Sequence, residues 1–319
     1  MAVPNPAGGN RRLTVFSMLR HFFLFLSRQR KLERWLLGVP GARRLAGQFV
    51  AGETLPEAMA AVRDLARSGR PSTLDHLGEN VRSAEQAHAS TDAYRETLEE
   101  IARQELDCSI SVKLTQLGLD ISEEQCREDL RLLAERAGQL GNHVRVDMEG
   151  SAYTDRTLAL IADLRKHYDT VGAVIQAYLY RSEADIRRLI EQETTVRLCK
   201  GAYQEPPSLA YPHKADVDAN FLRLARILLE SRLDHCIATH DARMIGETCR
   251  TADEIGLPKV GFEFQMLYGI RRDLQQQLIE RGYRLRIYIP FGKEWFPYFM
   301  RRLAERPANV LFVLKGLAR

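Results

Sequence analysis

The sequence predicts a (β/α)8 barrel of the TIM type, with extra helices before it and a final helix over the barrel mouth. From Pro71 onward, short apolar and β-branched runs alternate with longer amphipathic runs. Helical connections of this kind imply parallel strands. About eight such units in roughly 245 residues match a (β/α)8 barrel. A doubly wound sheet is the alternative, but no Gly-x-Gly-x-x-Gly motif follows an early strand to support it.

The alternation gives the expected elements in chain order. The predicted strands are Thr73–Leu77, Ser109–Thr115, His143–Met148, Gly172–Tyr178, Val196–Lys200, Cys236–His240, Val260–Gln265 and Leu285–Pro290. The predicted helices between them include Glu123–Gly138, Asp155–His167, Ser182–Gln192, Asp218–Ser231, Ala242–Ile255 and Arg271–Arg281. After the last strand, Pro297 suits the first turn of a final helix and Pro307 ends it.

The chain before the barrel has a different composition. Residues 1–10 are rich in Pro, Gly and Asn and are predicted to be disordered, residues 11–70 to be helical, and residues 71–319 to form the barrel. Residues 11–34 carry a charge of +6, against −2 for the rest of the chain. The basic amphipathic stretch 13–37 fits an anionic membrane surface, but packing on its own domain or on a partner subunit is favoured.

Composition excludes several classes of function. A net charge of +4 gives no strong case for nucleic acid. No apolar run approaches the roughly 18–20 residues of a membrane span. The five cysteines have no metal-binding spacing and indicate reduced thiols in a cytosolic compartment. No metal site is expected, because the histidines are scattered.

Polar residues gather where the predicted strands end, which in such a barrel is the position of the active site. A barrel needs branched apolar residues to fill its interior, so an ionisable group on almost every strand exceeds what packing requires. These residues are Asp75, Glu79, Lys113, Asp147, Gln176, Arg197, Lys200, Thr239, His240, Gln265 and Tyr288.

The final helix adds two adjacent arginines, Arg301 and Arg302. Successive helical residues point roughly 100° apart, so both guanidinium groups reach one small anion only over their shared edge. With Lys113 they could hold a carboxylate or a phosphate. The alternative is a solvated helix with an Arg301–Glu305 surface pair.

Nine segments then carry a family resemblance, and they cover the predicted barrel in order from about residue 71 to 310. They are LDHLGE (74–79), SVKLTQLG (111–118), RVDME (145–149), VIQAYLYRS (174–182), RLCKGAY (197–203), ATHD (238–241), FEFQMLYG (262–269), RIYIPFG (286–292) and YFMRRLAERPAN (298–309). The chain resembles proline dehydrogenases, flavoenzymes that oxidise L-proline to Δ1-pyrroline-5-carboxylate. Without the aldehyde dehydrogenase module of bifunctional relatives, it is similar to the monofunctional form.

The resemblance implies a role for each matching residue. Arg301, Arg302 and Lys113 would bind the proline carboxylate, and Tyr288 and Leu267 would shape the pocket over the ring. Glu79 would pair with Arg301 as a gate. Arg197, near the flavin N5 edge, and Asp147, beside the isoalloxazine, would be the catalytic pair. The residues expected to line or support the FAD site are Met148, Gln176, Lys200, Gly201, Ala202, Thr239, His240 and Glu305.

The resemblance also implies hydride transfer from proline C5 to FAD N5 and a membrane quinone as electron acceptor. It favours a cytoplasmic protein, with peripheral membrane contact at the inner face and oligomerisation left open. Two other functions compete: a Schiff-base aldolase using Lys113 or Lys200 as the amine nucleophile, and a basic scaffold that binds anionic lipid or nucleic acid through residues 11–34.

Overall fold

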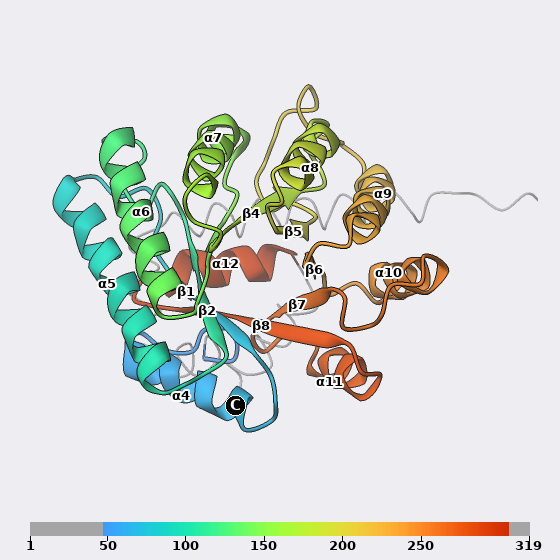
Figure 1. Ribbon diagram of the computed structural model, residues 1–319, viewed down its shortest axis with the longest axis horizontal. Coiled ribbons are helices and arrows are strands. Elements are labelled where there is room, and N and C mark those ends of the chain that lie inside the picture. The colour runs from blue at the N-terminus through green and yellow to red at the C-terminus, as the bar shows by residue number, and fades with distance from the viewer. Residues whose placement is uncertain (1–46, 306–319) are drawn as a thin grey trace, which may run out of the picture.

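A computed structural model describes residues 47–305, with side chains described from 47 to 300. The predictions for the disordered N-terminus, the basic stretch 13–37 and the helix end at Pro307 lie outside the described residues. Eight parallel strands close into a barrel in which each strand pairs with the next and the last pairs with the first (Figure 1). The predicted (β/α)8 barrel is confirmed. The strands are β1 Ser72–His76, β2 Cys108–Val112, β3 Val144–Val146, β4 Val171–Gln176, β5 Val196–Cys199, β6 Cys236–Ala238, β7 Glu263–Leu267 and β8 Arg284–Phe291.

Helices connect successive strands and surround the barrel in Figure 1. They are α5 Ala84–Arg103, α6 Glu123–Gln139, α7 Thr154–Arg165 (after the short 3-10 turn η1, Ser151–Tyr153), α8 Ser182–Glu191, α9 Lys214–Ser231, α10 Ala242–Glu254 and α11 Arg272–Glu280. Side-chain caps fix several of their starts. Ser83 accepts from the backbone N–H of Gln86 before α5, and Ser122 accepts from that of Gln125 before α6.

The first six strands, β1 to β6, each end earlier than the sequence predicts, and two of them matter most for the site. β3 ends at Val146 and β6 at Ala238, so Asp147, Thr239 and His240 lie just past the ladder, where their polar groups can turn into the mouth. β7 begins and ends later in the chain than the predicted strand Val260–Gln265. The residues before it form a turn, in which the N–H of Gly261 donates to the carbonyl of Pro258, so Val260 is excluded from the strand and exposed.

Two helices lie outside the regular alternation. α4 (Leu55–Ala66) packs against β1 and β8 and buries Met59, Val62 and Leu65 in the core that it shares with the barrel. α12 (Trp295–Glu305) follows β8 and crosses the barrel in Figure 1, instead of joining the outer ring.

Aromatic packing fixes α12 over the carboxyl ends of the strands. Trp295, Phe296 and Phe299 are buried in a cluster with Leu77, which follows β1, and with Leu267 at the end of β7. The final helix over the mouth, predicted from the sequence, is therefore confirmed.

The barrel interior is more polar than the sequence argument assumed. Side chains on strands that are not neighbours meet each other, and they can do so only through the interior. Arg197 on β5 reaches Ser111 on β2, and Tyr288 on β8 reaches Asp147 after β3. Alternate residues such as Leu74 and Ile110 belong to the apolar core instead. Apolar filling of the interior was thus a wrong premise, because hydrogen bonds and ion pairs occupy these layers.

Candidate active site

The centre of the site is the ammonium group of Lys113, the residue directly after β2. Its Nζ lies 2.8 Å from Oδ1 of Asp75 on β1 and 3.3 Å from Oδ2 of Asp147. Burial opposes the positive charge, but Asp75, Tyr288 and Asp147 raise the pKa of Lys113 well above its usual value. The amine is therefore held protonated. A Schiff-base nucleophile needs the neutral amine, so this environment disfavours the aldolase hypothesis at Lys113.

Asp147 is the common acceptor of the cluster. Its Oδ2 also accepts from the Tyr288 hydroxyl at 2.7 Å. Its Oδ1 accepts from Ser111 Oγ at 2.7 Å and from Arg197 Nη1 at 2.8 Å. Burial alone would raise the pKa of Asp147, but the charges of Lys113 and Arg197 outweigh it and lower the pKa. Asp147 is therefore a fixed anion that orients four side chains.

The pKa of Asp75 is shifted in the opposite direction from that of Asp147. Burial raises its pKa, and the attraction of Lys113 offsets that only in part, while the charge of Asp147 raises the pKa further. Two carboxylates and two cations thus balance one another at the mouth, counting Arg197. An additional anion would need a further positive charge.

Arg197 is held at two of its three guanidinium nitrogens. Nε donates to Oε1 of Gln265 at 2.5 Å, and Nη1 donates to Asp147 and to Ser111. The guanidinium carbon lies 5.0 Å from the ring centroid of Tyr288, within the range of a cation–π contact. Within residues 47–300, Nη2 makes no hydrogen bond.

The opposite side of the mouth is built from the ends of β4 to β6. Gln176 donates from Nε2 to the carbonyl of Glu149 at 2.8 Å and accepts from the N–H of Ala202 at 3.4 Å. The ammonium of Lys200 binds Asp218 and Asp241, the latter at 3.1 Å. Both contacts hold the Lys200–Ala202 turn against neighbouring elements.

Gly201 in this turn requires the absence of a side chain. Its φ is +115°, and a Cβ there would overlap the ring of Tyr178. Gly201 and Ala202 are exposed, so the backbone of the turn can approach a ligand closely. Just past the next strand, β6, Nε2 of His240 accepts from the N–H of Leu267 at 2.8 Å, and Thr239 is buried beside it.

The remaining predicted residues divide into two groups. Glu79 is half-buried in the loop after β1, Met148 is buried in the barrel core, and Leu267 packs against the aromatic cluster of α12. Arg301, Arg302 and Glu305 belong to α12 over the mouth, and their side chains lie outside the described residues. The structure thus brings Lys113, Asp147, Arg197 and Tyr288 together directly and leaves their contacts with α12 untested.

The sequence reasoning gave no role to Ser111, and it placed Asp75 and Gln265 at the mouth without a partner. A signal for Ser111 existed. It lies two residues before Lys113, and residues two apart on a strand point to the same side. The pairing of Asp75 with Lys113 had no local signal.

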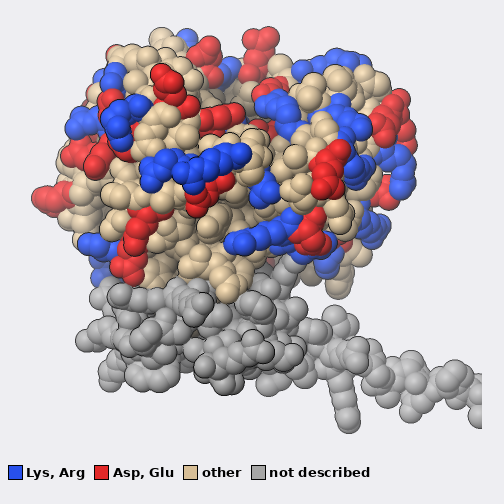
Figure 2. Space-filling model, turned by 90° about the horizontal axis from the view of Figure 1, so that it is seen from below, with Lys and Arg blue, Asp and Glu red and all other residues tan. Residues whose placement is uncertain are grey.

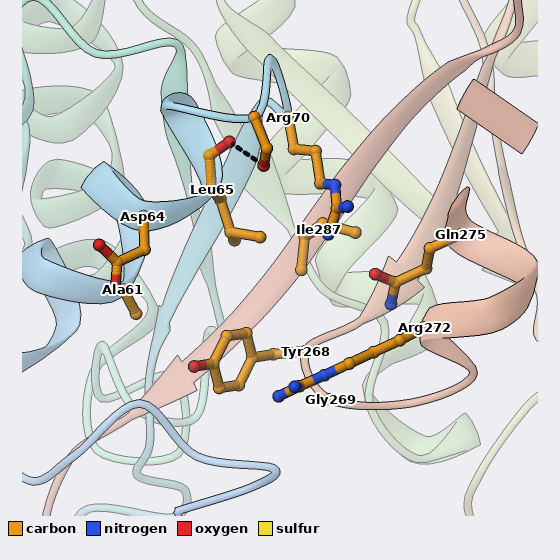
Figure 3. A pocket seen from close by; sticks show the side chains of 10 residues that line it. Ala61, Asp64, Leu65, Arg70, Tyr268, Gly269, Arg272, Gln275 and Ile287 are labelled. Atoms are coloured by element: carbon orange, nitrogen blue, oxygen red, sulfur yellow. Dashed lines mark hydrogen bonds between the residues drawn. The ribbon is translucent and has the colours of Figure 1, made fainter. Parts of the chain in front are cut away.

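A separate pocket of about 180 Å³ lies on the outer side of the barrel, between α4 and α11 (Figure 3). It is lined by Ala61, Asp64, Leu65, Ser68, Arg70, Tyr268, Gly269, Arg272, Gln275 and Ile287. None of the predicted site residues lines it. This pocket is therefore distinct from the mouth.

The scaffold hypothesis rests on residues 11–34, which lie outside the described residues. On the face in Figure 2, Lys and Arg side chains are interspersed with Asp and Glu, without a broad area of one sign among the coloured residues. In the part of the chain that the structure covers, no helix is long and apolar enough to cross a membrane. The same residues hold no group of three or more His, Cys, Asp or Glu side chains suited to a metal ion.

A closed parallel barrel with a buried charge cluster at the carboxyl ends of its strands defines a (β/α)8-barrel enzyme. The sequence model of the proline dehydrogenase family matches residues 58–315, so the chain belongs to the proline dehydrogenase family. It is thus an oxidoreductase of proline metabolism, which confirms the resemblance seen in the sequence.

Individual relatives agree with this assignment. "Proline dehydrogenase 1" of Bacillus subtilis (strain 168) is 42% identical over 300 residues, covering 94% of this chain and 99% of that protein. "Proline dehydrogenase" of Deinococcus radiodurans is 40% identical over 280 residues, covering 86% of this chain and 90% of that protein. Among solved structures, proline utilization A (PutA) from Bdellovibrio bacteriovorus, inactivated by N-propargylglycine, matches with a TM-score of 0.78 and 28% identity. That match covers 83% of this chain, which spans 33% of the longer PutA chain.

Proposed function

We propose that the protein uses FAD to oxidise L-proline to Δ1-pyrroline-5-carboxylate, the first step of proline breakdown, and passes the electrons to a quinone. The observation that carries the proposal is the buried cluster of Asp75, Lys113, Asp147 and Arg197 at the mouth of a family member's barrel. Such a cluster is expensive to bury and is built where a charged ligand must be oriented.

The residues at the ends of β4 to β6 fit a flavin nucleotide. The glycine turn at Gly201 leaves room that any side chain would fill, and the exposed peptide groups of the turn suit a large polar ligand. Lys200, already paired with Asp218 and Asp241, would offer its remaining N–H donor to a phosphate of the nucleotide. The residues that would hold FAD are Met148, Gln176, Lys200, Gly201, Ala202, Thr239, His240 and Glu305. When bound, FAD would supply N5 as the acceptor of the hydride from C5 of proline, whose amine, bound unprotonated, would become the protonated imine.

Charge balance supports a substrate grip that reaches beyond the described cluster. Two carboxylates neutralise the charge of Lys113 and occupy two of its N–H donors. Lys113 can therefore offer one further N–H donor to the proline carboxylate, but no surplus charge. Arg301 and Arg302, directly after the buried Met300 of α12, would supply the missing positive charge. Glu79 would pair with Arg301 once substrate is bound, closing the site.

Tyr288 and Leu267 would shape the pocket around the pyrrolidine ring. The hydroxyl of Tyr288 donates to Asp147 and the guanidinium of Arg197 lies over its ring, so two contacts restrict the position of the ring. Leu267 ends β7 and packs against the α12 cluster, which places an apolar side chain between the barrel and the helix. This arrangement supports catalysis in which the protein orients the bound proline and forms no covalent bond to it.

Arg197 would act through preorganised charge. Its guanidinium is already held at Nε and Nη1, so no reorganisation is required to place Nη2 against a developing negative charge. The quinone acceptor, the cytoplasmic location, any membrane contact of residues 13–37 and the oligomeric state stay predictions.

The proposal is tested with Arg197→Met, which keeps the length of the side chain and removes its charge. Anaerobic mixing with L-proline should show flavin reduction in the wild-type protein and a rate lower by about a hundredfold in the variant, with flavin still bound. Lys166→Met on the exposed end of α7 serves as a control and should match the wild type. An unchanged rate for Arg197→Met would remove Arg197 from the reaction centre.

A further inference from the structure

We infer that Gln265, held in turn by Glu263, is a positioning residue that fixes the guanidinium group of Arg197. The inference rests on the proposed function, because it concerns the residue proposed to face the flavin. Gln265 and Glu263 lie two residues apart on β7 and point to the same side of the strand, into the barrel. Both are buried, with 4% and 2% of their surface exposed.

The Gln265 amide connects the two charged groups in a single orientation. Its Oε1 accepts from Arg197 Nε at 2.5 Å, and its Nε2 donates to Oε1 of Glu263 at 2.7 Å. A guanidinium can only donate and a carboxylate can only accept. Turning the amide over would set donor against donor and acceptor against acceptor. Glu263 therefore determines which end of the amide faces Arg197.

Glu263 is itself held from the next strand. Nε of Arg286 lies 3.1 Å from each of its carboxylate oxygens. Arg286 also donates from Nη1 to the carbonyl of Ser72 at 2.8 Å and from Nη2 to Asp107 at 3.0 Å. Because Asp107 directly precedes β2, the chain of contacts runs from Arg197 at the mouth to the opposite end of the barrel. Arg197, Gln265, Glu263 and Arg286 all lie on strands, which anchor this chain of contacts.

This chain decides the orientation of Arg197. Asp147 and Ser111 hold only Nη1, and a guanidinium tied at one nitrogen can still tilt about that contact. A second contact at Nε, from a different strand, fixes its plane and so fixes Nη2. An apolar residue in place of Gln265 could fill the volume but could not supply the second contact. The polar relay is therefore more specific than packing requires.

The test combines Gln265→Leu with Arg197→Met in a double-mutant cycle on the flavin-loaded protein. Three quantities are measured: the rate of flavin reduction at saturating L-proline, the apparent dissociation constant for L-proline, and the midpoint potential of the flavin. Gln265→Leu should reduce about ten- to a hundredfold more slowly, since a small misplacement of a catalytic group costs that much. The apparent dissociation constant should stay unchanged, and the midpoint potential should fall, because the positive charge is less well placed.

In the Arg197→Met background, Gln265→Leu should cause no further change in rate or potential, because residues that act through one another are not additive. Gln265→Met, which is unbranched, is a second variant with the same expectations if Gln265→Leu does not fold. Thr248→Val is the control. It removes a buried hydroxyl that, among the described residues, bonds to the Met244 carbonyl within α10, so it should leave rate and potential at wild-type values.

Wild-type rate and potential in both Gln265 variants would overturn the inference, as would effects that multiply fully with those of Arg197→Met. Failure of the proposed function looks different. In that case the wild-type protein itself carries no flavin, or L-proline does not reduce it.

Discussion

Replacement of Lys113 by methionine tests the charge cluster most severely. Methionine keeps an unbranched apolar stem but leaves the carboxylates of Asp75 and Asp147 without their shared cation. The side chains of Lys113 and Asp75 are only 11% and 2% exposed, so water cannot replace the lost contact. Asp147 still has Arg197, whereas Asp75 has lost its cation. The main cost should therefore fall on Asp75.

Removal of one partner from a buried ion pair costs about 3–5 kcal/mol of unfolding free energy. That loss should depend on pH. Asp75 already has a raised pKa because of its burial, and the loss of Lys113 raises it further. When the pKa of a carboxyl group is higher in the folded than in the unfolded state, its ionisation destabilises the folded protein. The free energy of unfolding therefore falls as pH rises from the unfolded-state pKa to the folded-state pKa. The loss should therefore be largest near pH 8 and smaller near pH 5.

The assay is urea unfolding followed by far-ultraviolet circular dichroism at both pH values. Lys166→Met is the matched control, since this pair with Asp163 is exposed and should cost about 0–1 kcal/mol. The double variant Lys113→Met/Asp75→Leu should recover much of the stability, because it removes the stranded carboxylate as well. A loss for Lys113→Met no greater than for Lys166→Met, at either pH, would refute the buried ion-pair cluster.

Three further predictions concern other parts of the site. Arg301→Ala or Arg302→Ala should raise the KM for proline at least about tenfold while FAD stays bound, because a bidentate carboxylate contact is lost; steady-state kinetics with an unchanged KM in both variants would remove them from the substrate site. Gly201→Ala should lose most of its FAD and about 1–3 kcal/mol of stability, because φ is +115° and the new Cβ overlaps a tyrosine ring. Flavin absorbance per protein checks this, with Gly69→Ala, at positive φ but in open space, keeping its flavin. Burial raises the pKa of Glu149 to about 6, so its ionisation should cost stability as pH rises from about 4.5 to about 6. Glu149→Gln should flatten the dependence of unfolding free energy on pH over that range. An unaltered slope would contradict the raised pKa of Glu149.

The local sequence pattern predicted the barrel because the hydrophobic periodicity of a strand or a helix is visible within about ten residues. The residues at strand ends followed from the same pattern, since the carboxyl ends of parallel strands meet at one mouth. Lys113, Asp147, Arg197 and Tyr288 were found in this way, and they meet in the structure. The final helix was predicted from Pro297 and Pro307, and the adjacent Arg301 and Arg302 suggested that it closes over the mouth.

Cross-barrel partners were beyond such reasoning. Asp75 and Lys113 lie 38 residues apart, and Tyr288 and Asp147 lie 141 residues apart. Their pairing depends on the closure and register of the whole barrel, which no local pattern carries. For the same reason the polar interior was missed. Single residues such as Glu263 look out of place in a strand until Arg286 and Gln265 are seen beside them.

The most direct test of the central claim is an anaerobic absorbance spectrum of the purified protein, before and after the addition of L-proline. The account predicts a flavin band that bleaches with L-proline and persists with D-proline or hydroxyproline. The cations would hold the carboxylate in one place, and Tyr288 would shape the pocket around the ring, so only L-proline should fit both. A flavin band that L-proline leaves unchanged would contradict the proposed substrate. Absence of a flavin band, even after FAD is supplied, would contradict the proposed cofactor.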